Sequence, residues 1–546
     1  MTSNSSGQLR YEDSLSSVSS LSIDVAPPSF FNRLLISFYS RVRRPLAANS
    51  YERFLTGRKS TKRASYAQHP VTTADQRDVG HVTIDILPED ALLEMFDFYL
   101  HDTNLDAWHK LVHVCRKWRN VIFSSPRRLN LRLYCNARTP ARKMLNIWPG
   151  LPIFLYNSGH EKWGMDNIFA TFKHTDRICE LSLFDIPSSQ SEKVLAEMQQ
   201  PFPGLTGLHL GFDDETPLVV PASFLGGSAP LLQILDLNNI PFPGLPKLLL
   251  SAIHLVSLSL LEIPYSGHFS PEVLVTCLSV LTRLESLRIG FKSPRSRAGQ
   301  KSRHPPPRTL LPFLTKLYFK GVCEYLDDLV ARIDAPLLDS LHMTFFNQLI
   351  FDTPQLAQFI CHAPKIKAQH RAYVAFADSY VQVTLPQTSY GTPGLELNIS
   401  CSQIDWQLSS LMQVCSSSFP QALMHTVEDL YISEDRFSWQ DDIEINQWLE
   451  ILHPFTAVKD LKLSWDFTRH IAPAVQELIG ERTMEVLPAL QTLSIDVTPT
   501  RDEPIPSEFP FPSQESIERF VVARKLVGHP ITITVRRSLD ENELNK

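Results

Sequence analysis

Apolar residues recur along this chain in a short pattern, apolar-x-x-Leu-x-apolar, at intervals of a few tens of residues. Successive side chains of a strand point to opposite sides, so the apolar positions would face a shared core and the residue before the last one would face out. One such strand cannot bury its own apolar side, so the pattern predicts stacked copies that form a solenoid. The stretches that fit are 178–183, 205–210, 232–237, 255–260, 284–289, 314–319, 338–343, 427–432, 458–463 and 490–495.

The spacing of these stretches is close to the period of leucine-rich repeats. Their central leucines stand at positions 181, 208, 235, 258, 287, 317 and 341, and later at 430, 461 and 493. The pattern blurs between 345 and 425, although 381–385 and 395–399 still alternate like strands. Helical segments are expected between later strands, at 443–452 and 472–479. The usual Asn after the third apolar position is missing, which predicts an irregular solenoid.

Residues 82–130 show a helical period instead. Pro88 suits a helix start, and Glu89 and Asp90 suit the positive end of the helix dipole. A second helical pattern runs from Leu111 to Ile122 and carries Cys115 on its apolar side. Two or three helices of this length have a small core, so a partner or the following domain is expected to cover part of it.

Residues 1–80 lack repeated apolar periodicity and carry 11 Lys or Arg against 6 Asp or Glu, which predicts a mostly disordered segment. Within it, 29–45 places aromatic and aliphatic residues on one helical side. That segment is either a membrane-surface or partner-binding helix, or a short piece that packs back on the protein. Residues 536–546 are expected to form a C-terminal tail.

The formal charge of −6 over 546 residues argues against a general nucleic-acid binder. The chain has eight scattered cysteines and no Cys-x-x-Cys pair, which favours buried thiols in a reducing compartment. With a polar N-terminus and no apolar stretch that reads as a membrane span, the expected location is cytoplasmic, nuclear or both, without stable membrane insertion. The basic segment 292–308 is interpreted as a solvated loop, with a phosphate or nucleic-acid site as the alternative.

Motifs of catalysis are scarce. We find no Gly-x-Ser-x-Gly, no phosphate-binding glycine loop and no His-Glu-x-x-His. His109, His113 and Cys115 come nearest to a metal cluster but lack an evident fourth ligand. The acidic groups 213–215 and 441–444 are interpreted as solvated residues, with cation binding as the alternative. We therefore expect no cofactor, no metal and no enzyme activity; an enzyme whose site is invisible in the sequence is the less favoured alternative.

The helical unit resembles an F-box. The residues that carry the resemblance are Ile86–Phe96, which reads ILPEDALLEMF, then Leu111–Arg119, which reads LVHVCRKWR, and Ser125-Pro126. Many F-boxes have a Trp after Ser-Pro, where this chain has Leu129. The whole of 82–540 is similar to the fungal F-box proteins with degenerate leucine-rich repeats. This implies an α/β fold, in which a small N-terminal helical F-box at 82–130 precedes an irregular leucine-rich-repeat solenoid at 140–535.

The resemblance also implies a role as the substrate-recognition subunit of an SCF-type cullin–RING ubiquitin ligase. The F-box would bind the ligase adaptor subunit, and the repeats would bind a protein substrate whose identity the sequence does not reveal. An F-box scaffold that acts outside a ligase is the alternative. The candidate adaptor-binding residues are Leu87, Pro88, Leu92, Leu93, Phe96, Val114, Cys115 and Trp118.

Candidate substrate-binding residues follow from the repeat pattern itself. The position before the last apolar residue should form one outward row, with its outward neighbours two residues away. These candidates are His209, Asp236, Arg288, Lys316, Tyr318, Lys320 and His342. Arg and Tyr often anchor protein interfaces, and the basic stretch would suit an acidic or phosphorylated segment. Recognition through the irregular loops is the alternative.

Overall fold

The computed structural model describes residues 87–537 apart from 103–107, 137–140, 149, 158–164, 187, 213–218, 295–307, 349, 368, 387–392, 435–444, 480–481 and 498–513. These residues belong to one compact unit, Val82–Lys546. The predicted segments 1–80 and 29–45, the C-terminal tail beyond 537 and most of the basic loop 292–308 lie outside them.

Three helices open the described chain: α2 (Glu89–Asp102), α3 (Trp108–Val112) and α4 (Arg116–Ser124). The second helical pattern is therefore two helices, and the prediction of one continuous helix was wrong. Cys115 has extended backbone angles, and its Sγ accepts a hydrogen bond from the Trp118 N–H at 3.5 Å, which caps α4. The apolar periodicity continues across the break because α3 and α4 both turn apolar residues toward the same core.

The core of these helices is closed by aromatic side chains. Phe96 packs edge-on against Trp118 with ring centroids 4.8 Å apart. Trp108, fully buried, packs against Trp148, and its indole Nε1–H donates to the carbonyl of Arg132 at 3.1 Å. The segment that follows the helices thus covers part of their small core.

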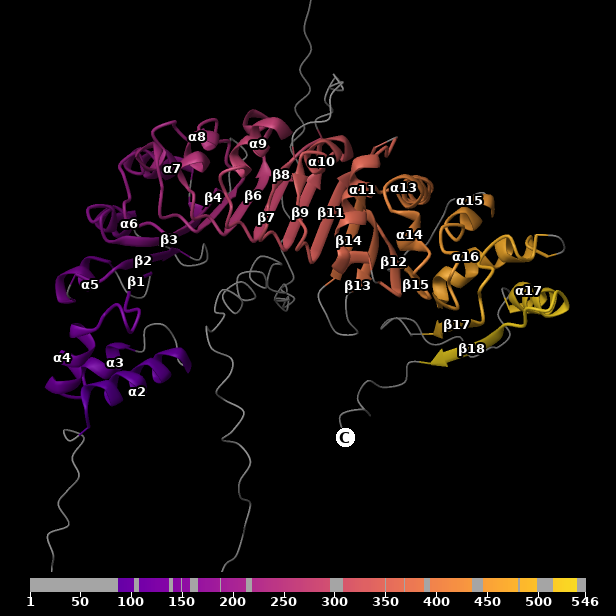
Figure 1. The fold of residues 1–546 in the computed structure, drawn as a ribbon, viewed down its shortest axis with the longest axis horizontal. Coiled ribbons are helices and arrows are strands. Elements are labelled where there is room, and N and C mark those ends of the chain that lie inside the picture. Colours follow the sequence, from indigo (N-terminus) through magenta and orange to yellow (C-terminus); the bar gives the residue numbers. More distant parts are fainter. Residues whose placement is uncertain are drawn as a thin grey trace, which may run out of the picture. The chain divides into compact units, whose positions relative to one another are not determined.

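Within the described residues, sixteen strands form one sheet (Figure 1). Its order is β1-β2-β3-β4-β5-β6-β7-β9-β11-β14-β13-β12-β15-β16-β17-β18. The strands are β1 (Leu133–Cys135), β2 (Ile153–Asn157), β3 (Ile178–Ile186), β4 (Gly207–Phe212), β5 (Ile234–Asn238), β6 (Ser257–Ile263), β7 (Ser286–Phe291), β9 (Lys316–Gly321), β11 (Ser340–Phe346), β12 (Arg371–Ala377), β13 (Tyr380–Pro386), β14 (Pro393–Ser400), β15 (Asp429–Glu434), β16 (Asp460–Ser464), β17 (Thr492–Val497) and β18 (Thr532–Arg537). A second, two-stranded sheet joins β8 (Thr309–Leu310) to β10 (Ile333–Asp334).

Every stretch of the leucine pattern overlaps a strand, and most neighbouring strands pair in parallel, as a repeat solenoid requires. The central leucines stack in register: Leu208 pairs with Leu235, and Leu235 with Leu258. All three are fully buried, and each contributes about 1.5–3 kcal/mol of hydrophobic stabilisation.

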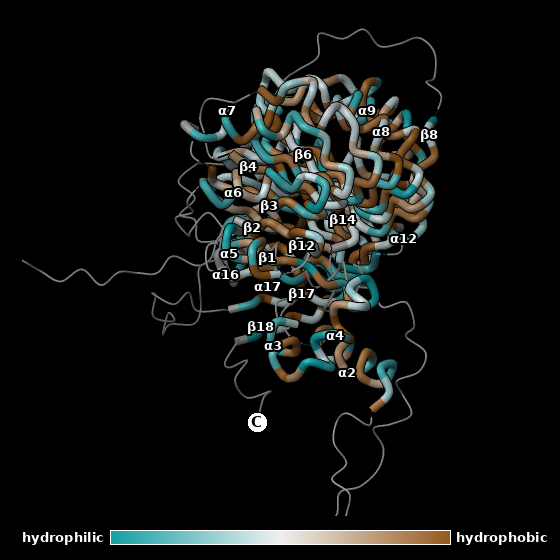
Figure 2. The backbone as a smooth tube through the Cα atoms, turned by 90° about the vertical axis from the view of Figure 1, so that its left-hand side faces the viewer, coloured by the Kyte–Doolittle hydropathy of each residue, from teal (hydrophilic) through white to brown (hydrophobic). Residues whose placement is uncertain are grey.

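Helices connect the strands and line one side of the sheet in Figure 1. They are α5 (Ala141–Ile147), α6 (Met165–Phe172), α7 (Ser188–Glu197), α8 (Leu245–Ser251), α9 (Pro271–Leu278), α10 (Cys323–Val330), α11 (Pro354–His362), α12 (Pro364–Lys367), α13 (Ile404–Ser417), α14 (Gln421–Met424), α15 (Ile445–Glu450), α16 (Trp465–Gln476) and α17 (Gln514–Leu526). Both sequence-predicted helical segments correspond to helices, although α16 begins seven residues earlier than expected. In Figure 2 hydrophobic residues, in brown, concentrate toward the interior of the layered body.

The blurred region of the sequence is a three-stranded meander. Strand β13 pairs antiparallel with both β12 and β14, whereas β14 pairs in parallel with β11 and β12 in parallel with β15. The last strand of the meander therefore lies beside β11, and the first lies beside β15. The leucine spacing fails here because a hairpin connection is much shorter than a repeat.

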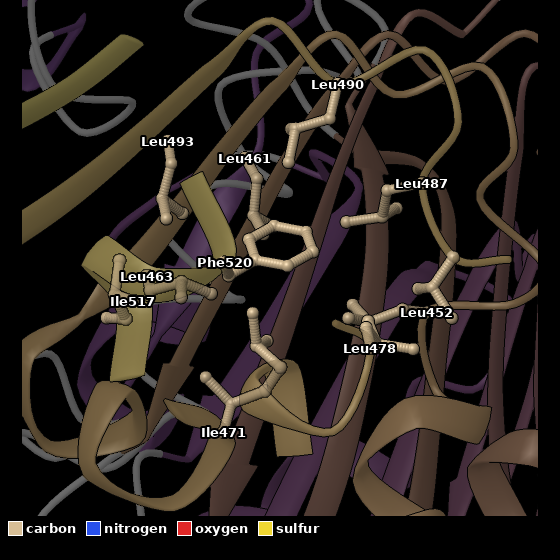
Figure 3. A pocket seen from close by; sticks show the side chains of 12 residues that line it. Leu452, Leu461, Leu463, Ile471, Leu478, Leu487, Leu490, Leu493, Ile517 and Phe520 are labelled. Carbon is tan, nitrogen blue, oxygen red and sulfur yellow. The ribbon is translucent and has the colours of Figure 1, made fainter. Parts of the chain in front are cut away.

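The C-terminal end of the core holds a cavity of about 20 Å³ between β16, β17, α16 and α17. Leucine and isoleucine side chains line it, with the ring of Phe520 among them (Figure 3). Its lining is almost wholly apolar and it is small, so we interpret it as a packing gap in the core.

Candidate protein-binding surface

The F-box candidate residues occupy different environments. Leu92, Leu93 and Phe96 are buried in the core, and Leu87 and Trp118 pack against it while partly exposed. Leu92, Leu93 and Phe96 therefore support the helical unit from within, whereas Leu87 and Trp118 keep part of their apolar surface accessible. The set is completed by Cys115, which caps α4, and by Pro88 and Val114, which are exposed.

Two exposed apolar side chains of this unit are not among the candidate adaptor-binding residues. Met95 and Phe98 on α2 are 50% and 64% exposed. Phe98 stands six residues after the buried Leu92 and is turned away from the core, whereas Met95, three residues after Leu92, lies at the edge of the buried side. They add apolar area to the surface of the helical unit.

The outward residues of the repeats form one row, which we call the open row. Backbone pairing places each member beside the next. Its members are Tyr156, Ser182, His209, Asp236, Ser259, Arg288, Tyr318, His342, Glu396, Thr384, Tyr373, Tyr431, Lys462, Ser494 and Thr534. The structure thus brings together five of the predicted substrate-binding residues. Lys316 and Lys320 lie two positions from Tyr318 on β9 and share its side of the sheet.

The first part of the open row is polar but recessed. Ser182, His209 and Ser259 are buried, and Ser182 Oγ and Ser259 Oγ have no hydrogen-bond partner within the described chain. His209 Nδ1 lies 3.6 Å from Asp236 Oδ2, an electrostatic contact rather than a hydrogen bond. The sequence placed His209 and Asp236 on one side of the sheet, as the pairing shows, but it did not reveal that His209 is buried.

The middle of the open row is basic and aromatic. The Arg288 guanidinium lies over the Tyr318 ring, 5.2 Å from its centroid. Lys320 Nζ contacts Glu262 Oε1 at 2.7 Å, and the Lys316 side chain is exposed. Arg288, Lys316, Tyr318 and Lys320 thus lie together on one side of the sheet.

Farther along, His342 sits in a hydrogen-bonded group. Its Nδ1 lies 2.9 Å from Glu396 Oε2, and its Nε2 lies 2.8 Å from Ser340 Oγ. The side-chain amides of Gln382 and Asn398 both donate to Glu396 Oε1 at 3.0 Å. The hydrogen bond from His342, followed by those from the amides, holds the pKa of Glu396 below its usual value despite burial. Glu396 was missed because strand order in the meander is not encoded in repeat spacing.

The remaining candidates for chemistry have structural surroundings. His109 stacks on Trp148 with ring centroids 5.0 Å apart, and burial lowers its pKa. Burial raises the pKa of the Cys179 and Cys277 thiols to about 11. In the described chain no group of three or more His, Cys, Asp or Glu residues is arranged to hold a metal ion. The described helices include none with the length and hydropathy needed to cross a membrane.

Comparisons with known proteins add little to this geometry. No protein-family model matches the chain, and a search of curated proteins found no significant match. Among solved structures, the leucine-rich repeat-containing protein LegL7 from Legionella pneumophila is similar over 71% of this chain and 97% of its own. The two are 11% identical with a TM-score of 0.26, which is too low for a functional argument. The chain is a mixed α/β protein with a long, largely parallel sheet, consistent with a repeat solenoid.

Proposed function

We propose that this protein is a substrate receptor of an SCF-type cullin–RING ubiquitin ligase. The observation that carries the proposal is the joining of two parts in one compact unit. An F-box-like sequence folds as three helices with exposed apolar side chains, and a sixteen-stranded sheet follows it in the described chain. In this role the chain would catalyse no step of ubiquitin transfer and would act in the cytoplasm, the nucleus or both.

The adaptor would dock over the exposed apolar residues of the helical unit. Pro88, Met95, Phe98 and Val114 supply this surface, and the buried Leu92, Leu93 and Phe96 hold it in shape. Adaptor binding is therefore expected to be sensitive to both groups of residues, but only the buried group is expected to affect folding.

Affinity purification of the full chain tests this assignment. Met95→Glu combined with Phe98→Glu should abolish recovery of the adaptor and cullin while thermal unfolding stays unchanged. Val522→Glu is the matched control, since Val522 is 56% exposed on α17. Removing Leu87 and Pro88 together should also abolish recovery. Unchanged recovery in both variants would refute the F-box assignment, and recovery of the adaptor without cullin would favour a scaffold outside a ligase.

Substrate recognition is assigned to the open row, with its centre at Arg288 and Tyr318. A guanidinium held over an aromatic ring offers a positioned cation and an apolar surface, the two features that interface anchors combine. The exposed Lys316 extends the positive charge on the same side of the sheet. This arrangement favours an acidic protein segment.

A further inference from the structure

Strands β11 and β14 bring a serine, a histidine and a glutamate into one hydrogen-bonded line. Ser340 and His342 are two residues apart on β11 and so lie on the same side of the strand. His342 pairs with Glu396 on the neighbouring strand β14. The distances are 2.8 Å from Ser340 Oγ to His342 Nε2 and 2.9 Å from His342 Nδ1 to Glu396 Oε2. Hydroxyl, imidazole and carboxylate stand in the order found in serine hydrolases, with each ring nitrogen contacting the same kind of group.

The surroundings of Glu396 fix the direction of these hydrogen bonds. Two amide N–H groups, from Gln382 and Asn398, donate to its Oε1, which favours the ionised carboxylate. The carboxylate can only accept, so His342 Nδ1 carries the proton that it donates to Oε2. The neutral imidazole then has its lone pair on Nε2, which accepts the hydrogen bond from the Ser340 hydroxyl.

A positively charged side chain stands beside Ser340 in the sheet. Lys316 pairs with Ser340 across to β9, and its side chain is exposed on the same side of the sheet. On the other side, Leu341 pairs with Leu395 of β14, and Gly394 lies where the β13–β14 register shifts. Ser340 itself is only 8% exposed, so its hydroxyl is recessed in the sheet.

We propose that Ser340 is an activated nucleophile that accepts acyl groups from small esters. Its Oγ attacks the ester carbonyl carbon as His342 Nε2 takes the hydroxyl proton, and Lys316 stabilises the charge on the carbonyl oxygen. The acyl C–O bond breaks, and the proton passes from His342 to the departing alcohol. Water then attacks the acyl carbon, yielding the acid and free Ser340. This activity is separate from adaptor binding and does not depend on the proposed ligase role.

The test uses the full chain and an alkyl fluorophosphonate, in which attack by Ser340 Oγ forms an O–P bond and releases fluoride. Mass spectrometry of the digested protein should locate the adduct on Ser340, and Ser340→Ala should abolish it. His342→Gln and Glu396→Gln should each slow labelling by about 100-fold or more, the contribution of a general base and its support. Lys316→Met should slow hydrolysis of p-nitrophenyl acetate.

Ser416→Ala is the matched control, because Ser416 lies exposed on α13 and its hydroxyl donates to the carbonyl of Gln413 instead of contacting a histidine. Its labelling should equal that of the wild type. Absence of an adduct on Ser340, or equal labelling rates in the wild type and His342→Gln, would overturn the proposal. Thermal unfolding of each variant separates loss of activation from loss of fold. Alkylation by iodoacetamide gives a second readout: the Ser340→Cys variant should react faster than the double variant Ser340→Cys with His342→Gln.

Discussion

Lys320 and Glu262 form an ion pair across an intervening strand. Lys320 Nζ lies 2.7 Å from Glu262 Oε1, although β7 lies between their strands, β9 and β6. Two features allow this contact. Glu262 has a left-handed φ of 49° at the irregularity where the β6–β7 register shifts, and the intervening position on β7 is Gly290. A Cβ at Gly290 would meet Leu261 Cδ2 at 3.2 Å and Lys320 Cβ at 3.6 Å.

Gly290→Val is therefore expected to lower the free energy of unfolding by about 1 kcal/mol, the low end of overpacking costs. Most of the loss comes from displaced side chains, because a partly exposed ion pair contributes less than about 1 kcal/mol. Urea unfolding of this variant beside Lys320→Met separates the two effects. A larger loss in Lys320→Met than in Gly290→Val would contradict this explanation.

Charge reversal at the centre of the open row should remove substrate binding. Arg288→Glu with Tyr318→Ala eliminates the stacked cation while leaving the buried leucines of β7 and β9 in place. Proximity labelling in cells should then lose partner proteins but retain the ligase adaptor. Lys525→Glu, a charge reversal at an exposed position of α17 outside the row, is the control. If both variants label the same partners as the wild type, recognition uses the irregular loops.

Arg524 should contribute several kcal/mol to the free energy of unfolding through its contacts at the C-terminal end of the fold. Its side chain is fully buried, and its guanidinium donates to the carbonyls of Thr483, Leu487, Pro488 and Leu490. Arg524→Met leaves these buried acceptors unpaired, so we expect a loss of about 3 kcal/mol or more. Chemical denaturation measures it. Arg519→Met, in an exposed ion pair on the same helix, should change stability by less than about 0.5 kcal/mol.

The cavity near α17 makes Phe520 a sensitive position. Phe520 borders an existing cavity, so truncating its side chain enlarges that cavity, and the neighbouring side chains do not fill the space. Phe520→Ala should cost about 3–5 kcal/mol in urea unfolding. Val522→Ala, on the exposed side of the same helix, should cost less than about 0.5 kcal/mol. Comparable losses in the two variants would place the cavity outside the cooperative core.

Asp327 predicts a pH dependence of stability. Burial, partly offset by hydrogen bonds from the Leu356 and Gln355 N–H groups, raises its pKa to about 6 from the ordinary 3.8. A raised carboxyl pKa means that ionisation disfavours the folded state, so this contribution to stability is present below pH 3.8 and is lost as pH rises through 6.

Asp327→Asn keeps the accepting oxygen without the charge. It should gain stability relative to the wild type between pH 4 and 7, on the order of 1 kcal/mol after allowance for solvent screening. Thermal unfolding across that range measures the gain. Asp327→Ala, which also removes the acceptor, should be less stable than Asp327→Asn at every pH. A difference between Asn and wild type that does not change with pH would show that burial does not raise this pKa.

The sequence was a good guide wherever one repeat resembles the next. Each apolar-x-x-Leu-x-apolar stretch overlaps a strand because the requirement is local: alternate apolar side chains must enter a shared core. The same reasoning placed His209, Asp236, Arg288, Tyr318 and His342 in one register. It did not predict which of them are recessed, because exposure depends on the size of neighbouring side chains.

The candidate sites were less predictable where two segments meet. Cys115 fits an apolar helical period, yet it caps a new helix, because the break after α3 depends on local backbone geometry. Glu396 reaches His342 only through the strand order of the meander, and short strands such as β1 and β2 fall outside the leucine pattern. Among the F-box candidates, the sequence marked apolar residues correctly but did not separate core from surface.

The meander has a consequence for how such a protein can change length. It contains an odd number of strands, so its two outer strands point in the same direction. As a result, β14 is parallel to β11 and β12 is parallel to β15. Repeats on either side can therefore be gained or lost without reversing the strands beyond it. The meander therefore connects two arrays of parallel strands, and each array can change its number of repeats and its surface residues independently of the other.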